Sequence, residues 1–487
     1  MLQAEELSAA TVFVDGRWRV GNGEEYASVD PSTAATFATW HLADVVQADA
    51  AVAAARATFA AWSRTQPGER ATVLRRFADL LEKHHEELAQ LVVTEVGSPI
   101  SLARTLQTAT PVANLRWAAD MAETGPRGGY VERLPPLEGP PRVESELLRV
   151  PIGVVAAVTP YNYPVNMIAW KVGPALAAGC TVVLLPSPRG TLCSVAVVRL
   201  AEEAGVPPGV LNLVPGGPDV GQRLSSHPDV DLVSFTGSNA VGAAVAEAAA
   251  RTHTKVVLEL GGKSPTVLLP GADLNRAVGP SMLRFCRNAG QGCGATTRIL
   301  VHHSQYDEFV EAATAFLREH APVGDPRNED TEVGPLISDA HRQRVEGYLR
   351  RAVEAGAAIL AGGGRPDRPG YYLEPTLVGD VDAGDEICQD ELFAPVVTVL
   401  AYDSVDEAVA LANDSRYGLN ALVWGDPADA HDVALRLETG TVAINGGGAA
   451  RPDVPWTGFK HSGVGSEMGL DGFAEFFTVR HLQWPEA

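Results

Sequence analysis

The sequence contains only five cysteines, and their spacing excludes two common uses of this residue. No pair forms a C-x-x-C metal pattern, and five thiols in 487 residues do not make the dense framework of a disulfide-stabilised protein. Free thiols fit a reducing compartment. No apolar stretch reaches membrane-spanning length, and the N-terminus carries Glu5 and Glu6 where a secretory signal has basic residues. We therefore expect a cytoplasmic protein that no membrane segment anchors.

Basic charge is also scarce. The sequence has 38 Lys and Arg against 60 Asp and Glu, a formal net charge of −22. Nucleic acids and anionic membrane surfaces are bound through basic patches that neutralise phosphate, and the basic residues here are scattered. We expect neither nucleic acid nor a membrane as a partner.

Hydrophobic residues are abundant at 46%, enough to fill the cores of two or three domains. Apolar side chains at helical spacing predict a helix over residues 42–62 and further long helices over 69–124. Four prolines between residues 131 and 150 preclude a continuous helix and flank short strand-like pieces. We interpret this segment as a part of the chain that leaves its domain.

From residue 154 onward, apolar strands alternate with helices, which is typical of parallel sheets covered by helices on both faces. The expected strands of a first sheet are residues 154–158, 181–185, 211–214, 232–235 and 256–260, with helices over 165–178 and 193–204. A second alternating set is expected to begin near 298–302 and to run through 394–402 and 441–444. The fold class is therefore α/β with two domains, and the functional site is expected between them.

Cys293 lies in the glycine-rich phrase Asn288-Ala289-Gly290-Gln291-Gly292-Cys293-Gly294. Such a stretch leaves backbone amides near the sulfur and little bulk around it, which suits a nucleophilic thiolate. The alternative is that a free cysteine is simply a small buried hydrophobe, and Cys180, Cys193 and Cys388 are interpreted in that way.

Glu259 ends an apolar strand, in Leu258-Glu259-Leu260-Gly261-Gly262-Lys263. Burial at such a position raises the pKa of a carboxyl group and makes it a usable general base. A salt bridge with Lys263, or a surface position at the end of the strand, is the alternative. Asn162, in Thr159-Pro160-Tyr161-Asn162, is a further candidate for the site. The alternative is that it is only a turn residue.

The phrase Phe235-Thr236-Gly237-Ser238-Asn239-Ala240-Val241-Gly242 ends a strand and opens a helix. Free amides at a helix start bind phosphate, and glycine permits close approach. The phrase does not match the G-x-G-x-x-G dinucleotide fingerprint, so an ordinary turn is the alternative.

These four phrases occur together, and along the chain they follow the order found in the aldehyde dehydrogenase superfamily, which the sequence resembles over essentially its whole length. Further matches are Asp15-Gly16, Gly324-Asp325-Pro326, Glu391-Leu392-Phe393-Ala394-Pro395, Ile444-Asn445 and Lys460-His461-Ser462-Gly463-Val464-Gly465. The joint match is more specific than any single motif, and it favours the functional interpretation of each.

The resemblance implies an NAD(P)-dependent enzyme of the non-acylating, hydrolytic type that needs no metal. Cys293 would attack the aldehyde carbon, and the Asn162 amide with the backbone N–H of Cys293 would stabilise the oxyanion. After hydride transfer leaves a thioester, Glu259 would activate the water that hydrolyses it. The separation of 34 residues between Glu259 and Cys293 also matches the family.

The resemblance places a nicotinamide dinucleotide against a set of residues from several strands and loops. These are Pro160, Tyr161, Leu185, Ser187, Gly217, Phe235, Gly237, Ser238, Val241, Leu260, Gly261, Glu391 and Phe393. The chain departs from the family at Leu185 and Pro188, where Lys-Pro-Ser-Glu is common. Leu185 cannot pair with a 2′-phosphate and Pro188 cannot accept from a 2′-hydroxyl. The loss of a cation favours NAD over NADP, although Arg189 is a candidate replacement.

The fold implied is that of the aldehyde dehydrogenases: a Rossmann-like cofactor domain, an α/β catalytic domain and a small β oligomerisation element. The expected boundaries are 1–130 with 150–261 for the first, 262–463 for the second, and 131–149 with 464–487 for the third. Because this element extends the sheet of another subunit in the family, we expect a homodimer or homotetramer.

The substrate positions of the family fall on Tyr163, Met167, Trp170, Arg287 and Trp456, beside Gly292 and Gly294. Small residues, Gly446–Gly448 with Ala449 and Ala450, form one wall. An aromatic or medium-length aliphatic aldehyde is expected rather than acetaldehyde. Arg287 either meets a distal polar or anionic group or points to solvent.

Two other functions remain open. A CoA-acylating semialdehyde dehydrogenase transfers the acyl group to a thiol, but such relatives generally lack the glutamate found here at Glu259. A catalytically idle member would serve as a binding protein, against which stand Cys293, Glu259 and Asn162.

Overall fold

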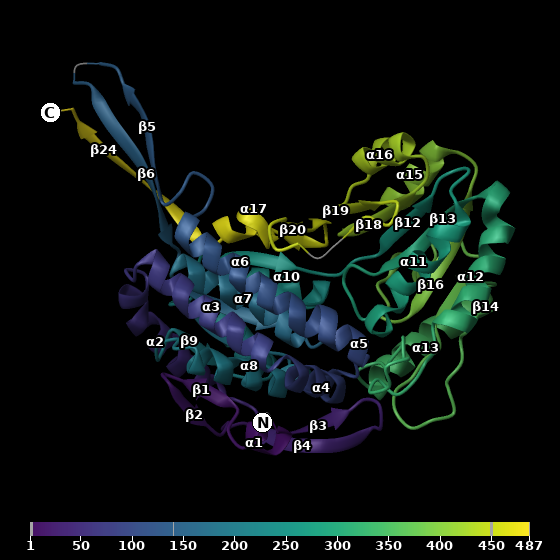
Figure 1. The fold of residues 1–487 in the computed structure, drawn as a ribbon, viewed down its shortest axis with the longest axis horizontal. Helices are drawn as coiled ribbons and strands as arrows, with labels where there is room; N and C mark the ends of the chain where they lie inside the picture. Colours follow the sequence, from purple (N-terminus) through teal and green to yellow (C-terminus); the bar gives the residue numbers. More distant parts are fainter. Residues whose placement is uncertain (1–2, 140, 449–450, 487) are drawn as a thin grey trace.

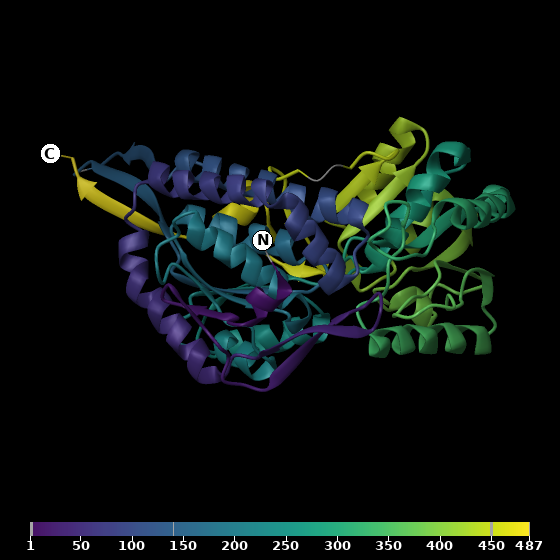
Figure 2. The same ribbon diagram turned by 60° about the horizontal axis from the view of Figure 1, so that its bottom comes forward.

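The computed structural model describes residues 3–139, 141–448 and 451–486. Its body has two halves, each built on a largely parallel sheet with helices packed against it, and a β arm projects from the first half (Figure 1). Turning the molecule shows the first half, in purple to teal, beside the green and yellow second half (Figure 2). The two-sheet α/β architecture agrees with the alternation of the sequence.

The first sheet has eight strands in the order β2-β1-β9-β8-β7-β10-β11-β22. Its five central strands are parallel and confirm the five that the sequence predicts. The strands are β1 (Val12–Val14), β2 (Arg17–Arg19), β7 (Val154–Thr159), β8 (Thr181–Pro186), β9 (Leu211–Leu213), β10 (Leu232–Thr236), β11 (Lys255–Glu259) and β22 (Gly463–Val464). From β7 the chain builds β8 and β9 on one side and then returns to build β10 and β11 on the other. Such a reversal opens a ligand-binding crevice at the carboxyl ends of the strands.

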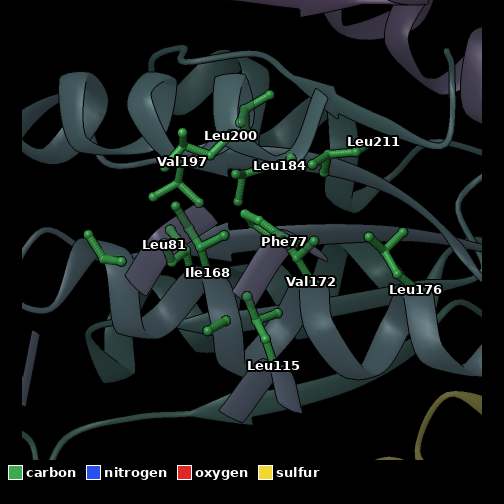
Figure 3. Packing of buried hydrophobic residues seen from close by; sticks show 14 of the residues in the cluster. Phe77, Leu81, Leu115, Ile168, Val172, Leu176, Leu184, Val197, Leu200 and Leu211 are labelled. Carbon is green, nitrogen blue, oxygen red and sulfur yellow. The ribbon is translucent and has the colours of Figure 1, made fainter. Parts of the chain in front are cut away.

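Alternate side chains of these strands enter two separate cores, because successive residues of a strand point to opposite faces. Val155 and Leu184 pack with helices on one face, and Val154 and Val183 pack with helices on the other. The first face is covered by α3 (Pro67–Lys83), α4 (His85–Val96), α6 (Thr110–Thr124), α7 (Pro164–Ala178) and α8 (Thr191–Glu203). The second is covered by α2 (Val45–Trp62), α9 (Pro218–Ser225) and α10 (Asn239–Ala250). Figure 3 shows the first core, where Phe77, Ile168 and Val197 meet Leu184.

The helices predicted over residues 42–62 and 69–124 are present, with breaks that the pattern does not show. Gly97, with a φ of 78°, ends α4, and a π-helical segment, η1 (Ala103–Ala109), runs into α6. Such π segments are often found at functional sites.

The second sheet has seven strands in the order β14-β15-β16-β13-β12-β18-β19, of which β14 alone is antiparallel to its neighbour among the described strands. The strands are β12 (Ser264–Leu268), β13 (Thr296–His302), β14 (Ala358–Ala361), β15 (Thr376–Gly379), β16 (Val396–Tyr402), β18 (Asn420–Trp424) and β19 (Thr441–Ile444). The expectation that this sheet begins near residue 298 is wrong, because β12 precedes it and lies centrally. The sequence does not indicate this strand, because Pro265 lies within it and proline is unusual in a central strand. The register of pairing shifts between Ser264 and Pro265.

Helices and shorter strands complete the described chain. The helices are α1 (Ala4–Ser8), α5 (Ile100–Leu102), η2 (Pro188–Gly190), α11 (Leu274–Cys286), η3 (Arg287–Gly290), η4 (His303–Gln305), α12 (Tyr306–His320), α13 (Asp339–Glu354), α14 (Glu386–Gln389), α15 (Val405–Asn413), α16 (Pro427–Arg436) and α17 (Gly469–Ala474). The strand pairs are β3 (Glu25–Asp30) with β4 (Ala35–His41), β17 (Tyr417–Gly418) with β21 (Phe459–Lys460), and β20 (Trp456–Thr457) with β23 (Ser466–Glu467).

The arm is a three-stranded antiparallel sheet of β5 (Val131–Leu137), β6 (Val143–Pro151) and β24 (Phe477–Pro485). Its C-terminal strand begins at Phe477, whereas β22 pairs with β11 in the first sheet and α17 contacts α7. Residues 464–474 therefore lie against the first half and not in the arm, contrary to the expected boundary at residue 464. Sequence alone could not show this, because the pairing partner of β22 is about 200 residues away.

Among residues 3–139, 141–448 and 451–486, no helix combines the length and apolar character needed to cross a membrane.

Candidate active site

The parallel strands of the first sheet have their carboxyl ends at the same edge, and several predicted site residues lie at or just after these ends. Pro160 follows β7, Ser187 follows β8, Gly237 follows β10, and Glu259 is the last residue of β11. Cys293 comes from the second half, between η3 and β13. The site thus forms where the second half meets the carboxyl edge of the first sheet.

The loop that carries Cys293 has an unusual backbone. Asn288, Ala289 and Gly290 have φ values of 53°, 54° and 71°, so three consecutive residues are left-handed. A side chain on Gly290 would place its Cβ 2.1 Å from the carbonyl of Ala394, so only glycine fits there. Left-handed residues other than glycine are strained, and such strain is common in active sites. The strained turn sets the direction in which the chain enters Cys293.

Asn162 is bound to this loop from several directions. Its Nδ2 donates to the carbonyl of Gln291 at 2.9 Å, and its own carbonyl accepts from Nδ2 of Asn288 at 3.0 Å. Gln107, from the π-helical segment, donates to the same carbonyl at 2.9 Å. One hydrogen of the Asn162 amide remains after the bond to Gln291. The turn interpretation of Asn162 is therefore incomplete, because its side chain joins the β7 loop to the cysteine loop.

Glu259 is 4% exposed, and its Oε1 accepts a hydrogen bond from Nε1 of Trp456 at 3.0 Å. Its Oε2 has no hydrogen-bond partner among the described residues. Burial, followed by the negative charge of Glu467, raises the pKa of Glu259 to about 8. No salt bridge joins Glu259 to Lys263 within the described chain, and the carboxyl group is buried, so neither the Lys263 pair nor a surface position accounts for Glu259.

Lys171 and Glu467 form a buried ion pair near Glu259 that the sequence analysis does not identify. Lys171 also donates to the hydroxyl of Ser234 at 3.1 Å, and Oε2 of Glu467 has no partner among the described residues. The positive charge of Lys171 lowers the pKa of Glu259, opposing Glu467. A signal was present, because a lysine inside the predominantly apolar helix α7 requires a buried partner.

Cys293 is partly exposed, whereas Cys180, Cys193, Cys286 and Cys388 are buried. Burial of its thiol group, followed by the charge of Glu259, raises the pKa of Cys293 well above its usual value. The backbone N–H of Gly294 acts in the opposite direction. Cys293 and Glu259 are therefore close enough to be coupled, and Glu259 is positioned to take the proton from the thiol.

The predicted phosphate-binding turn is open to solvent. Ser238, the N-cap of α10, makes no capping hydrogen bond through its side chain, and Val241 is 50% exposed. A Cβ on Gly237 would lie 2.5 Å from the Phe235 ring, so the turn needs glycine. Free N–H groups at such a helix start can receive a pyrophosphate.

Glu391 and Phe393 approach from the second half. The Gly262 N–H donates to Oε1 of Glu391 at 2.9 Å, and a Cβ on Gly261 would lie 2.3 Å from Oε2. The ring of Phe393 packs edge-on against Tyr161, with ring centroids 6.2 Å apart. Burial raises the pKa of Glu391 to about 7. These contacts place both residues beside the end of β11 and the loop after β7.

The other predicted cofactor residues occupy the same edge or support it. Leu185 and Phe235 are 5% exposed, Leu260 is 7% exposed and packs on Gly242, and Ser187 and Gly217 are the N-caps of η2 and α9. Leu185 and Phe235 therefore act mainly through packing in the second core of the first sheet.

The predicted substrate residues divide into an aromatic group and a basic group. The ring centroids of Trp170 and Trp456 are 6.1 Å apart. Met167, which lies on helix α7 with Trp170, is 6% exposed. The hydroxyl of Tyr163 would lie 3.5 Å from a Cβ on Gly292, next to Cys293. Arg287 is exposed and lies within electrostatic reach of Tyr163.

The small-residue wall is only partly described. Gly446–Gly448 are exposed, and Ala449 and Ala450 lie outside the described residues. A separate surface hollow of about 750 Å³ lies between α3, α6 and Pro452, and none of the predicted site residues lines it. In the part of the chain that the structure describes, no group of three or more His, Cys, Asp or Glu side chains is arranged to hold a metal ion.

Comparison with known proteins identifies the family of the chain. The model of the aldehyde dehydrogenase family matches residues 18–482. A 3-succinoylsemialdehyde-pyridine dehydrogenase from Pseudomonas is 40% identical, over 96% of this chain and 97% of the relative. A geranial dehydrogenase from Castellaniella defragrans is 39% identical, over 96% of each.

Solved structures give the same result. Aldehyde dehydrogenase C from Pseudomonas syringae, in a cysteine-to-alanine form with NAD+ and octanal, is 40% identical with a TM-score of 0.93, covering 99% of this chain and 98% of that one. A betaine aldehyde dehydrogenase from Staphylococcus aureus with NAD+ is 35% identical with a TM-score of 0.94, covering 99% and 96%. The chain therefore belongs to the aldehyde dehydrogenase family and has its fold. It is an NAD(P)-dependent aldehyde dehydrogenase.

Proposed function

We propose that Cys293 is the nucleophile, Glu259 the general base and Asn162 an oxyanion donor in the oxidation of an aldehyde to a carboxylic acid. The observation that carries this proposal is that the three residues converge from the end of β7, the end of β11 and the η3–β13 loop. Asn162 is hydrogen-bonded to Gln291 of the cysteine loop, and the charge of Glu259 acts on the thiol of Cys293. Cys293 loses its proton to Glu259 and attacks the aldehyde carbon. The remaining Asn162 N–H and the backbone N–H of Cys293 bind the oxyanion that forms.

Glu391 and Phe393 would hold the nicotinamide ring and its ribose, and the bound cofactor would accept the hydride that leaves the hemithioacetal carbon. The carbon then forms a thioester with Cys293. Glu259 returns its first proton to solvent, takes a proton from water, and the hydroxide attacks the thioester carbon and releases Cys293. Lys171 and Glu467 tune the base, because the charge of Glu467 raises the pKa of Glu259 and the charge of Lys171 lowers it. The hydrolytic route is favoured over transfer to CoA by the buried position of this carboxyl group.

We infer that NAD+ is the preferred cofactor. Leu185 is uncharged and 5% exposed, so it offers nothing to a 2′-phosphate. The candidate replacement, Arg189, lines a hollow of about 200 Å³ with Tyr26 and Glu95, and no predicted cofactor residue lines that hollow. The aldehyde is proposed to be aromatic or of medium length, because Trp170 and Trp456 form an aromatic surface near Glu259.

The test of this proposal is NADH and NADPH formation, followed by absorbance, with aliphatic, aromatic and semialdehyde substrates. We expect reduction of NAD+ with a kcat/KM at least about tenfold above that for NADP+, since a buried charge without a partner is costly. Equal use of both cofactors would contradict the cofactor preference. Absence of reduction with every aldehyde would contradict the proposed mechanism and favour an idle binding protein.

We also propose that the first half binds the cofactor, the second carries the nucleophile, and the arm joins subunits into a homodimer or homotetramer. The arm supports this because Val131, Leu137, Val479 and Trp484 expose apolar surface on strands that extend away from the body. Exposed apolar strands are an aggregation hazard unless another chain covers them. Sedimentation velocity is expected to show a dimer or tetramer, and a monomer at micromolar concentration would refute the assembly.

A further inference from the structure

Trp456, the first residue of β20, makes a hydrogen bond that holds the carboxyl group of Glu259. Its indole N–H donates to Oε1 at a distance of 3.0 Å. The other oxygen, Oε2, has no hydrogen-bond partner among the described residues. A glutamate side chain can adopt several rotamers, and a bond at one oxygen restricts the direction of the other. Oε2 is therefore the atom that is free to accept a proton from a thiol or a water.

The indole ring of Trp456 is itself fixed by its neighbours. Its centroid lies 6.1 Å from that of Trp170 on α7, and its backbone pairs with that of Glu467 between β20 and β23. A Cβ on Gly294, the residue after Cys293, would lie 3.0 Å from Cη2 of the indole. The ring thus fills the space between α7 and the cysteine loop, and its N–H has a defined direction.

Trp170 provides a comparison within the same site. Its Nε1 is also buried, but it has no hydrogen-bond partner among the residues that the structure describes. The two rings pack together, yet it is the N–H of Trp456 that bonds to the carboxyl group. Packing between two rings needs no N–H, and a phenylalanine would supply it. The indole nitrogen of Trp456 therefore has a role besides that of its ring.

We propose that Trp456 is a positioning residue for the general base: its indole N–H holds Oε1 of Glu259 so that Oε2 faces the thiol of Cys293 and, later, the hydrolytic water. In this role Trp456 acts through Glu259 and not on the reacting atoms. The role is distinct from the proposed contact of the indole ring with the aldehyde. The inference rests on the proposed function of Glu259 as the base and adds the residue that orients it.

The bond also affects the charge state of Glu259, because a donor to a carboxylate stabilises its ionised form. Burial, followed by the charge of Glu467 on β23, raises the pKa of Glu259. The indole of Trp456, the thiol of Cys293 and the charge of Lys171 on α7 act in the opposite direction. Loss of the indole N–H removes one of these opposing contributions. The pKa of Glu259 should then rise, and a higher pH is needed before Glu259 can act as a base.

The experiment measures kcat between about pH 6 and 10 for the wild type and for Trp456→Phe, at saturating NAD+ and aldehyde. The variant keeps an aromatic ring for packing and removes the donor to Glu259. We expect the midpoint of the rise in kcat to move upward by about one pH unit, as the loss of a hydrogen bond to a charged group implies. At a pH well below the wild-type midpoint, kcat should therefore fall about tenfold. The amplitude of the first burst of NADH shows that the variant folds and binds NAD+.

Trp170→Phe is the matched control, because it makes the same change in the neighbouring ring and removes an N–H that has no partner in the described chain. Since Trp170 belongs to the proposed substrate surface, this variant is expected to change the KM for the aldehyde. Its midpoint should stay that of the wild type. The inference is overturned if both variants move the midpoint equally, or if Trp456→Phe lowers kcat at every pH and keeps the wild-type midpoint, as a packing role would.

A second measurement needs no substitution at Trp456. In wild-type protein labelled with 15N-tryptophan, one of the eight indole N–H resonances should move with pH at the midpoint of kcat. This movement should be absent in Glu259→Gln, and its absence from the wild type would refute the inference even if Trp456→Phe does not fold. A wild-type kcat that does not rise with pH would instead refute the proposed function of Glu259. A normal wild-type rise with an unshifted midpoint in Trp456→Phe would refute this inference alone.

Discussion

Replacing Cys293 by alanine is expected to lower NADH formation with any aldehyde by about four orders of magnitude or more, because no covalent intermediate can form. Without the sulfur, the aldehyde carbon cannot become the tetrahedral centre that releases hydride. The oxyanion donors and the cofactor site would remain, since Cys293 is partly exposed in a loop shaped by Asn288, Ala289 and Gly290. The variant should therefore bind NAD+ with nearly wild-type affinity, measured by fluorescence titration.

Cys286→Ala is the control for this variant. Cys286 is fully buried in the core of the second half and belongs to the same segment of the chain. Its replacement should lower stability slightly while leaving most of the activity. Retention of more than about one hundredth of the activity by Cys293→Ala would exclude the thioester route.

Replacing Glu259 by glutamine is expected to separate the two halves of the reaction. The first turnover should still produce a burst of NADH, because thioester formation needs a base only once and solvent can serve more slowly. Steady-state turnover should fall about 100- to 10,000-fold, the usual contribution of general base catalysis. Stopped-flow absorbance measures both phases in one experiment.

The pH dependence of the wild type follows from the pKa of Glu259, which burial raises to about 8. Glu259 acts as a base only when it is deprotonated, so hydrolysis should be slow below this pKa, rise with pH through about 8 and level off above it. Glu259→Gln should show no such rise. A wild-type profile that is flat between pH 6 and 9 would contradict the assignment of Glu259 as the base.

Glu391→Gln is the matched control, because Glu391 is also a carboxyl group whose pKa is raised by burial, here to about 7. Since Glu391 contacts Gly262 and is expected at the nicotinamide riboside, its loss should raise the KM for NAD+ and slow the burst. A normal burst of NADH followed by slow hydrolysis is expected for Glu259→Gln and not for Glu391→Gln. The reverse pattern would exchange the roles of the two carboxyl groups.

The sequence predicts the central strands of the first sheet well, because each is an apolar run followed within a few residues by glycine or proline, and all but β11 lead into a helix. It misses β12, because Pro265 lies within the strand and the register shifts there. The predicted boundary of the arm is also too early. It begins at residue 464, whereas the strand of the arm, β24, begins at Phe477. The pairing of β22 with β11 depends on a contact between distant segments, which no local pattern contains.

The proposed catalytic residues can be selected from the sequence, because Cys293 and Glu259 lie in distinctive glycine-rich phrases. Their environment is not predictable in the same way. The bond from Trp456 to Glu259 and the Lys171–Glu467 pair each join residues almost 200 or more positions apart.

The most direct test of the central claim is the mass of the protein after a single turnover. Glu259→Gln is mixed with NAD+ and a substrate aldehyde, quenched with acid during the burst, digested and analysed by mass spectrometry. The proposed mechanism predicts one acyl group, attached to the peptide that contains Cys293, in an amount equal to the NADH formed. A burst of NADH without this adduct, or with the acyl group on another residue, would contradict it.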